Sequence, residues 1–458
     1  MKKYSWSTVS LAVSILLVLS VSVAEAEAGS VERPNLILIL ADDLGHGDLS
    51  CHGSTEVSTP HLDRLASEGV MMTHMRANCT VCSPTRAAIL TGKYADRAGV
   101  PGVIRTSPDQ SWGYLDPNLP TLANSLSDAG YHTAIVGKWH LGLEAPNTPL
   151  DRGFDHFHGF LGDMMDDYYT HRRGGLNLMR HDRQTIDPPG HATELFTQWS
   201  MEYLSSRSEH HEQPFFLYLP YNAPHFPIQP PALWEAKIRQ QFPGLTDARI
   251  KNVAFVEHLD DQIGRLLQHV DKLGLRENTV IAFTSDNGGS LPHAQNNDPW
   301  RGGKQSHYDG GLRVPCFFRY PPEIEAGTKH DSPVLTFDIA ATFMAYAGLE
   351  IPEDFDAIDM RHAIAGENVA AEREMYFVRR EGGPAYGGKA YHAIIKGKWK
   401  LLQNDPYSPL ELYDLENDPG EKTNLAGEKK GVVRRLQMDI SRHIQQGGAT
   451  AWQPPSLR

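Results

Sequence analysis

Cysteine is scarce in this chain, which limits what can hold the fold together. Only four cysteines occur among 458 residues, too few for disulfides to form the framework of a chain of this length. If one of the four is used for chemistry, the other three allow one disulfide at most. The hydrophobic content of 40% must supply the core instead, and the length suits one large domain or two to three ordinary ones.

Positive charge is also in short supply. Lys and Arg number 43 against 56 Asp and Glu, which gives a formal net charge of -13. This balance argues against nucleic acid and against an anionic membrane as the main partner. A small anion remains compatible with it, because an acidic protein can concentrate its cations in one pocket.

A long apolar run occurs only at the start of the chain. Lys2 and Lys3 precede the apolar segment Val9–Val23, and the small residues of Ala24–Ala28 follow it. This order predicts a secretory signal peptide over residues 1–28, and the apolar segment is short for an uncleaved anchor, which is the alternative. No cysteine stands near the cleavage point to carry a lipid. We therefore expect a periplasmic or secreted protein without stable membrane insertion.

Four short apolar runs each end in side chains that can bind a metal or carry a proton. They are Asn35–Ala41 before Asp42-Asp43, Thr133–Val136 before Gly137-Lys138-Trp139-His140, Phe215–Leu219 before Asn222-Ala223-Pro224-His225, and Thr279–Thr284 before Ser285-Asp286-Asn287. Such runs are typical of buried parallel strands. Because ligands collect beyond the carboxyl ends of parallel strands, we expect the four groups to meet at one site.

Helical patterns lie between these runs, as a parallel sheet requires. The expected helices begin at Thr59-Pro60 and Ser83-Pro84, and two more run over Leu122–Ala129 and Asp247–Leu273. The segment Asp163–Pro189 has no clear periodicity and is expected to be an irregular loop. The pattern as a whole predicts an α/β protein with a large mixed, mostly parallel sheet flanked by helices.

The sequence pattern changes near Gly366. Short strand patterns follow at Glu374–Val378, Tyr391–Ile395 and Trp399–Leu402, and a helical pattern follows at Lys430–Ile444. These segments predict a smaller antiparallel sheet with a terminal helix. We therefore expect a catalytic domain over residues 29–365 and a C-terminal subdomain over residues 366–458.

The most informative motif is Cys82-Ser83-Pro84-Thr85-Arg86. A proline suits the first turn of a helix, where backbone N–H groups and an arginine attract anions. The motif therefore predicts an enzyme that handles an anion. The pattern Cys-x-Pro-x-Arg followed by Leu90-Thr91-Gly92 resembles the signature of the type I sulfatases of the alkaline phosphatase superfamily. Lys396–Leu401 and Leu412–Pro419 resemble the C-terminal subdomain of the same enzymes.

The resemblance implies an alkaline phosphatase-like fold and the hydrolysis of a sulfate ester, with a sulfated carbohydrate as the expected substrate. It also implies that Cys82 is oxidised to formylglycine by a formylglycine-generating enzyme, a transient partner. The hydrated aldehyde offers one hydroxyl to attack sulfur and a second whose deprotonation expels sulfate.

Four side chains at strand ends are oxygen ligands, namely Asp42, Asp43, Asp286 and Asn287. Oxygen ligands suit a hard cation such as calcium, whereas zinc prefers His or Cys. The alternative is that both pairs are ordinary turns, in which Asp and Asn are common. The resemblance implies that these four residues bind calcium together with the modified Cys82.

Basic residues are expected around the same site. Arg86 follows Cys82 by one helical turn and is expected to hold the hydrated aldehyde. Lys138 and His140 alternate, which places both on one face of an extended segment. The resemblance assigns Lys138 to the sulfate and His140 to the base that drives elimination.

Two further basic residues complete the expected catalytic set. His225 follows Pro224, and Lys304 follows two glycines that permit close approach to a ligand. Either one is expected to protonate the leaving oxygen, and both are expected, with Lys138, to bind substrate.

Two other functions fit parts of the pattern. A phosphate or phosphonate monoester hydrolase on the same scaffold is the nearest, but phosphatases of this superfamily commonly use Ser or Thr with two zinc ions. A catalytically inactive protein that binds sulfated glycans is the other, and it is disfavoured because every catalytic position is intact.

Overall fold

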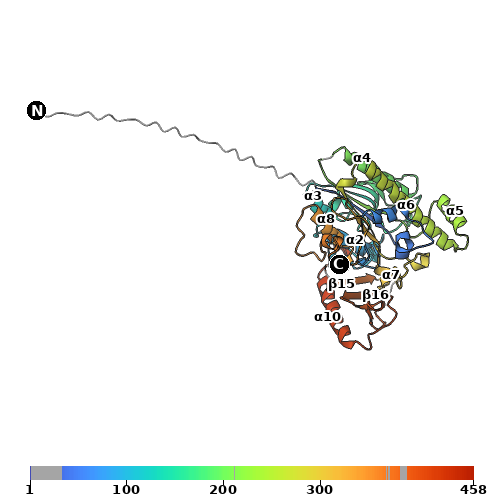
Figure 1. Ribbon diagram of the computed structural model, residues 1–458, viewed down its shortest axis with the longest axis vertical. Helices are drawn as coiled ribbons and strands as arrows, with labels where there is room; N and C mark the ends of the chain where they lie inside the picture. Colours follow the sequence, from blue (N-terminus) through green and yellow to red (C-terminus); the bar gives the residue numbers. More distant parts are fainter. Residues whose placement is uncertain (2–32, 211, 368, 370–371, 382–388, 458) are drawn as a thin grey trace. The chain divides into compact units, whose positions relative to one another are not determined.

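The structure is a computed structural model. It describes residues 1, 33–210, 212–367, 369, 372–381 and 389–457, and residues 33–458 group into one compact unit (Figure 1). Apart from Met1, the predicted signal peptide lies outside the described residues. Within the described part of the chain, no helix has both the length and the apolar character needed to cross a membrane.

A ten-stranded mixed sheet forms the centre of the fold. Its order is β13-β2-β12-β11-β1-β10-β4-β5-β8-β9. The bounds are β1 Asn35–Ala41, β2 Val70–Met72, β4 His132–Lys138, β5 His156–Phe160, β8 Met179–His181, β9 Gln184–Thr185, β10 Phe215–Pro220, β11 Thr279–Ser285, β12 Cys316–Arg319 and β13 Thr328–His330. The five strands from β11 to β5 are parallel to one another. The expectation of a large mixed, mostly parallel sheet is confirmed.

The register of the central strands aligns their carboxyl ends. In the parallel pair of β1 and β11, Ala41 lies opposite Ser285, and in the pair of β1 and β10, Leu40 lies opposite Pro220. All residues of β1, β10 and β11 are buried, as expected for strands covered on both faces. Residues that directly follow these strands are therefore neighbours in space.

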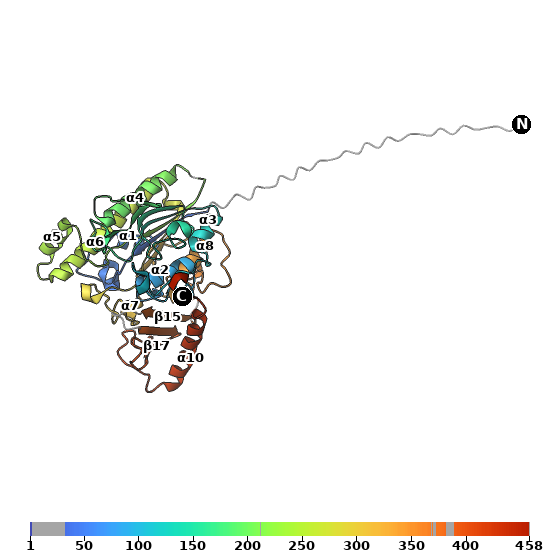
Figure 2. The ribbon, with the colours of Figure 1, turned by 180° about the vertical axis from the view of Figure 1, so that it is seen from behind.

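Helices cover the sheet in two groups on opposite sides of it (Figures 1 and 2). In one group α6 packs against α1, α4 and α5, and in the other α2, α3 and α8 pack together. The bounds are α1 Pro60–Ser67, α2 Cys82–Thr91, α3 Leu122–Asp128, α4 Ala192–Ser208, α5 Ala232–Gln241, α6 Asp247–Lys272, α7 Asp309–Leu312, α8 Asp338–Tyr346 and α9 Arg361–Ile364. The four helices expected from the sequence are present, with ends within two residues of the expected ones.

The segment Asp163–Pro189 is more regular than expected. It contains β6 Arg172–Arg173, β7 Leu176–Asn177, β8 and β9, and β8 extends the main sheet by antiparallel pairing with β5. Strands of two or three residues are too short to show alternation in the sequence. Another small sheet joins β3 Met75–Arg76 to β14 Val334–Leu335.

The C-terminal segment forms the expected small antiparallel sheet and helix. The order is β15-β16-β17-β18, with bounds Glu374–Glu381, Lys389–Lys396, Trp399–Gln403 and Glu411–Asp414. Helix α10, Lys430–Gly447, packs on β16 and β17. This part of the predicted fold is confirmed, whereas the division of the chain at residue 366 stays a prediction.

A buried ionic network joins this small sheet to the rest of the unit. Lys400 of β17 places its Nζ 2.7 Å from Oδ1 of Asp309, at the start of α7, and 2.8 Å from Oε1 of Glu421. Arg76 of β3 donates to the same Asp309 carboxylate over 2.7 Å. All four side chains are buried, so the loss of one charge leaves the others without compensation.

We expect Lys400→Met to destabilise the protein by about 3–5 kcal/mol, because Glu421 then keeps a buried charge without its lysine. The control is Lys398→Met, whose Nζ lies 2.7 Å from Asp414 but whose side chain is 38% exposed; its cost should be about 1 kcal/mol or less. Unfolding in guanidinium chloride measures both variants, and equal midpoints for the two would contradict the role of the network.

Candidate active site

Four oxygen ligands predicted from the sequence come together at the carboxyl ends of β1 and β11. Asp42 and Asp43 follow β1, Asp286 and Asn287 follow β11, and all four side chains are fully buried. The backbone N–H of Asp43 donates to Asp286 over 3.2 Å, and the Asn287 amide donates to Asp43 over 2.8 Å. Asp43 has a φ of 64°. This turn of the backbone lets the carboxylates of Asp42 and Asp43 enter one cluster.

Cys82 is the first residue of α2 and lies beside this cluster. Its thiol lies 3.5 Å from Asp42 Oδ1, and Lys304 Nζ lies 3.5 Å from its sulfur. Ligand atoms of Asp42, Asp43, Cys82 and His225 all lie within 4.8 Å of one another. Residues as far apart in the chain as Asp43 and Lys304, which are separated by 261 positions, therefore share one site.

Three basic side chains face the three carboxylates. Lys138 Nζ lies 2.5 Å from Asp42 Oδ2, Lys304 Nζ lies 2.7 Å from the Asp43 carboxylate, and Arg86 Nη2 lies 2.8 Å from Asp286 Oδ2. Arg86 also donates to the carbonyl of Lys138 over 3.2 Å. Each acid thus has its own cation, and Arg86 ties the acidic cluster to the end of β4.

Two histidines present one ring nitrogen each to the site. His140 has a φ of 60°, so the segment is turned rather than extended as expected, and its Nε2 donates to the Ile104 carbonyl over 2.8 Å. Its Nδ1 is buried without a hydrogen-bond partner among the described residues. His225 Nδ1 donates to the Phe226 carbonyl, and its Nε2 lies 3.6 Å from Asp43.

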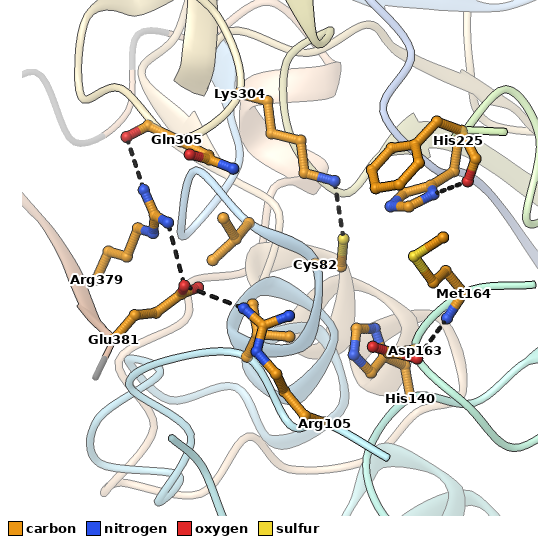
Figure 3. Close-up of a pocket in the computed structure, with 13 residues that line it drawn as sticks. Cys82, Arg105, His140, Asp163, Met164, His225, Lys304, Gln305, Arg379 and Glu381 are labelled. Atoms are coloured by element: carbon orange, nitrogen blue, oxygen red, sulfur yellow. Dashed lines mark hydrogen bonds and ion pairs between the residues drawn. The ribbon is translucent and has the colours of Figure 1, made fainter. Parts of the chain in front are cut away.

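A small pocket opens onto these groups (Figure 3). Its volume is about 80 Å³, and Cys82, His140, His225 and Lys304 line it. Side chains that the sequence analysis did not select complete the wall, namely Val81, Val103, Arg105, Asp163, Met164, Phe226, Gln305, Arg379 and Glu381. The pocket has the size of a small anion, with charged groups in its wall.

The most informative of the missed residues come from the small C-terminal sheet. Arg379 and Glu381 stand on β15, and both Arg379 and Arg105 donate to Glu381 Oε2 over 3.2 Å (Figure 3). The signal in the sequence is that Arg379-Arg380-Glu381 continues a buried apolar strand without a break. We expected that strand to stop at Val378, one residue before these charges.

Burial and neighbouring charges shift the pKa values of the acidic groups in different directions. Burial alone would raise the pKa of Asp42, but the charges of Lys138 and Arg86 hold it well below its usual range. Burial and the charge of Asp42 raise the pKa of Asp286 to about 7. Burial, again with Asp42, raises the pKa of Cys82 well above its usual value, so the encoded thiol stays neutral and is a poor nucleophile here.

The pKa values of the basic groups are also shifted in different directions. Burial and the charge of Lys304 lower the pKa of His225 to about 4, and burial with Lys138 lowers that of His140 well below its usual range. Burial alone would lower the pKa of Lys304, but Asp43 outweighs it and raises the value. The lysine is therefore a cation, whereas both histidines are neutral at physiological pH.

Comparison with protein families finds two matches. The sulfatase family model matches residues 34–349, and a model described as N-sulphoglucosamine sulphohydrolase, C-terminal, matches residues 302–447. The N-acetylgalactosamine-6-sulfatase of Mus musculus is 31% identical over 397 residues, which cover 81% of this chain and 72% of the relative. The N-acetylgalactosamine-6-O-sulfatase of Bacteroides thetaiotaomicron is 28% identical over 493 residues, covering 88% and 92%.

Solved structures share the fold. Ps i-CgsB in complex with k-i-k-neocarrahexaose superimposes with a TM-score of 0.83 at 28% identity, covering 93% of this chain and 96% of that one. The phosphonate monoester hydrolase SpPMH from Silicibacter pomeroyi gives 0.68 at 21% identity, covering 90% and 96%. The similarity to SpPMH shows only that the two proteins share a fold.

Removal of Arg86 should destabilise the protein by about 3–5 kcal/mol when the measurement is made in chelator, because Asp286 then loses its buried partner. The variant is Arg86→Met, measured by chemical unfolding beside Arg86→Met/Asp286→Asn. The double variant removes both charges and should recover part of the loss. A single variant as stable as the parent would show that the pair does not hold the acidic cluster.

Proposed function

The chain belongs to the type I sulfatase family of the alkaline phosphatase superfamily and is a sulfuric ester hydrolase, and we propose that it is an exported enzyme that removes sulfate from a sulfated carbohydrate. The observation that carries the proposal is the meeting of Cys82, four oxygen ligands and three cations beside one small pocket, which Cys82 and Lys304 line. Relatives named for N-acetylgalactosamine-6-sulfate support the carbohydrate. Export would place the enzyme in the periplasm or outside the cell.

A calcium ion fits the acidic cluster on one specific observation. Asn287 Oδ1 is buried and has no hydrogen-bond partner among the described residues, a costly state for an amide oxygen unless a cation or water binds it. With Asp42, Asp43 and Asp286 it forms an all-oxygen ligand set. These four residues would hold the ion together with residue 82.

The charges of the site are consistent with an added divalent cation. The acids Asp42, Asp43 and Asp286 face the cations Arg86, Lys138 and Lys304, so these six side chains carry no net negative charge. A bound calcium ion would supply two further positive charges, which would attract a sulfate oxygen and stabilise negative charge on residue 82. The site would then carry an excess positive charge suited to a sulfate ester anion.

We propose that residue 82 acts as formylglycine, made from Cys82 by a formylglycine-generating enzyme. The hydrated aldehyde supplies the hydroxyl that attacks sulfur and a second hydroxyl whose deprotonation releases sulfate. The neutral, elevated-pKa thiol supports this assignment, because an unmodified Cys82 would be a poor nucleophile.

The basic residues of the chain divide the remaining work. His140 lines the pocket with an unpartnered Nδ1, which makes it the base that takes the proton during sulfate release. Lys304, held as a cation by Asp43, is the proton donor for the leaving alcohol. The neutral His225 lines the pocket with its Nε2 beside Asp43 and would bind the substrate. Lys138 and Arg86 keep the carboxylates oriented, and Lys138 would also bind the sulfate.

The activity is tested on protein produced with the formylglycine-generating enzyme and supplied with calcium. Sulfate release from sulfated oligosaccharides of defined linkage and from an aryl sulfate should be measurable, and Cys82→Ala should reduce it by at least about 10⁴-fold, because the covalent nucleophile is lost. The alanine variant should fold normally, since one small side chain replaces another.

Matched aryl phosphate and phosphonate esters serve as controls. A faster rate on the phosphorus esters than on the sulfate ester would favour the phosphatase alternative. Parent protein that binds sulfated glycan without releasing sulfate would favour the binding protein, and either result would contradict the proposal.

Calcium binding is tested at Asn287. Asn287→Leu removes the unpartnered oxygen and should weaken calcium affinity by about 10–100-fold, whereas Asn287→Asp keeps an oxygen ligand and adds charge, so it should bind calcium at least as tightly. Isothermal titration of the chelator-treated proteins gives both affinities. Equal affinity in the leucine variant and the parent would remove Asn287 from the ligand set.

A further inference from the structure

A second group of metal-binding side chains lies on β5 and β8, outside the candidate active site. His156 and His158 are two residues apart on β5, so both point to one face of the sheet. His158 lies directly opposite His181 of β8 in the antiparallel register, which places the third ring on the same face. One ring nitrogen of each histidine lies within 4.8 Å of the others.

The three rings border a pocket of about 390 Å³. Its wall includes His132 of β4 and side chains of α4, among them Trp199, Tyr203 and Glu202, and it shares no lining residue with the pocket at Cys82. The volume leaves room for water beside the rings. This cavity is therefore distinct from the one assigned to the sulfate ester.

Neighbouring groups orient two of the rings. His156 Nδ1 lies 3.1 Å from Asp182 Oδ1, and since a carboxylate only accepts, Nδ1 carries the proton and Nε2 keeps its lone pair. A carboxylate behind a histidine is the usual arrangement at metal sites, where it fixes the tautomer and raises ligand basicity. His158 stacks on Trp199 with ring centroids 3.5 Å apart.

We propose that His156, His158 and His181 bind a zinc-class transition metal ion, with water in a fourth position. Three imidazoles suit zinc, copper or nickel and not calcium, so the ion would differ from the one at the acidic cluster. Zn–N bonds of about 2.0–2.1 Å require ligand atoms about 3.4 Å apart in a tetrahedral site. His181 is exposed on a three-residue strand, so its ring can close the remaining distance.

The ion would add a link between two strands that are already paired in the sheet. His156 and His158 belong to the parallel sheet, whereas His181 belongs to the β8–β9 hairpin at its edge. The same segment of chain begins with Asp163 and Met164, which line the pocket at Cys82. Metal binding would thus fasten the edge hairpin that leads back to the active-site wall.

The test is a zinc titration of tag-free protein that carries Cys82→Ala, stripped with chelator and held in excess calcium so that the acidic cluster is blocked. We expect about one equivalent of zinc to bind, with a rise in the thermal midpoint. His181→Ala should lower zinc affinity by at least about tenfold and abolish that rise. Its metal-free midpoint should match the parent, because the side chain is exposed.

The matched control is His362→Ala, whose side chain is 67% exposed and lies outside the cluster; it should bind zinc like the parent. Cobalt(II) gives a second readout, since its visible spectrum should show imidazole coordination in the parent and lose it in His181→Ala. The proposal is overturned if zinc fails to bind in excess calcium, or if His181→Ala binds it as tightly as the parent. Neither result would affect the proposed sulfatase activity.

Discussion

The arrangement of this protein depends on the burial of three carboxylates in one cluster. Asp42, Asp43 and Asp286 are brought together by the in-register ends of β1 and β11, and each is fully buried. Buried like charges repel strongly unless cations compensate them. Arg86 on α2, Lys138 at the end of β4 and Lys304 in a loop meet that need, and Lys304 also lines the pocket.

The small C-terminal sheet is part of the site and not merely attached to it. Arg379 and Glu381 of β15 line the pocket, and Lys400 of the same sheet ends in the ionic network around Asp309. The pocket wall therefore combines residues of the small C-terminal sheet with residues that follow the strands of the main sheet. A change that loosens the sheet would move charged groups in the pocket wall.

The sequence predicts the site better where its residues follow regular elements. Asp42, Asp286 and His225 come just after apolar strands, and Cys82 begins a helix, so strand-end logic and a local motif identify them. Arg105 pairs with Glu381 across 276 positions, and no local pattern encodes that contact. The three-residue β8 is too short to give a strand pattern in the sequence. Because its pairing with β5 is therefore not predicted, the proximity of His158 and His181 is not predicted either.

The most direct measurement is anomalous diffraction from crystals of the calcium-loaded, modified protein. The account predicts a peak within about 2.3–2.6 Å of oxygens from Asp42, Asp43, Asp286 and Asn287, beside residue 82. A calcium peak elsewhere, with the three carboxylates still paired with Lys138, Lys304 and Arg86, would contradict it.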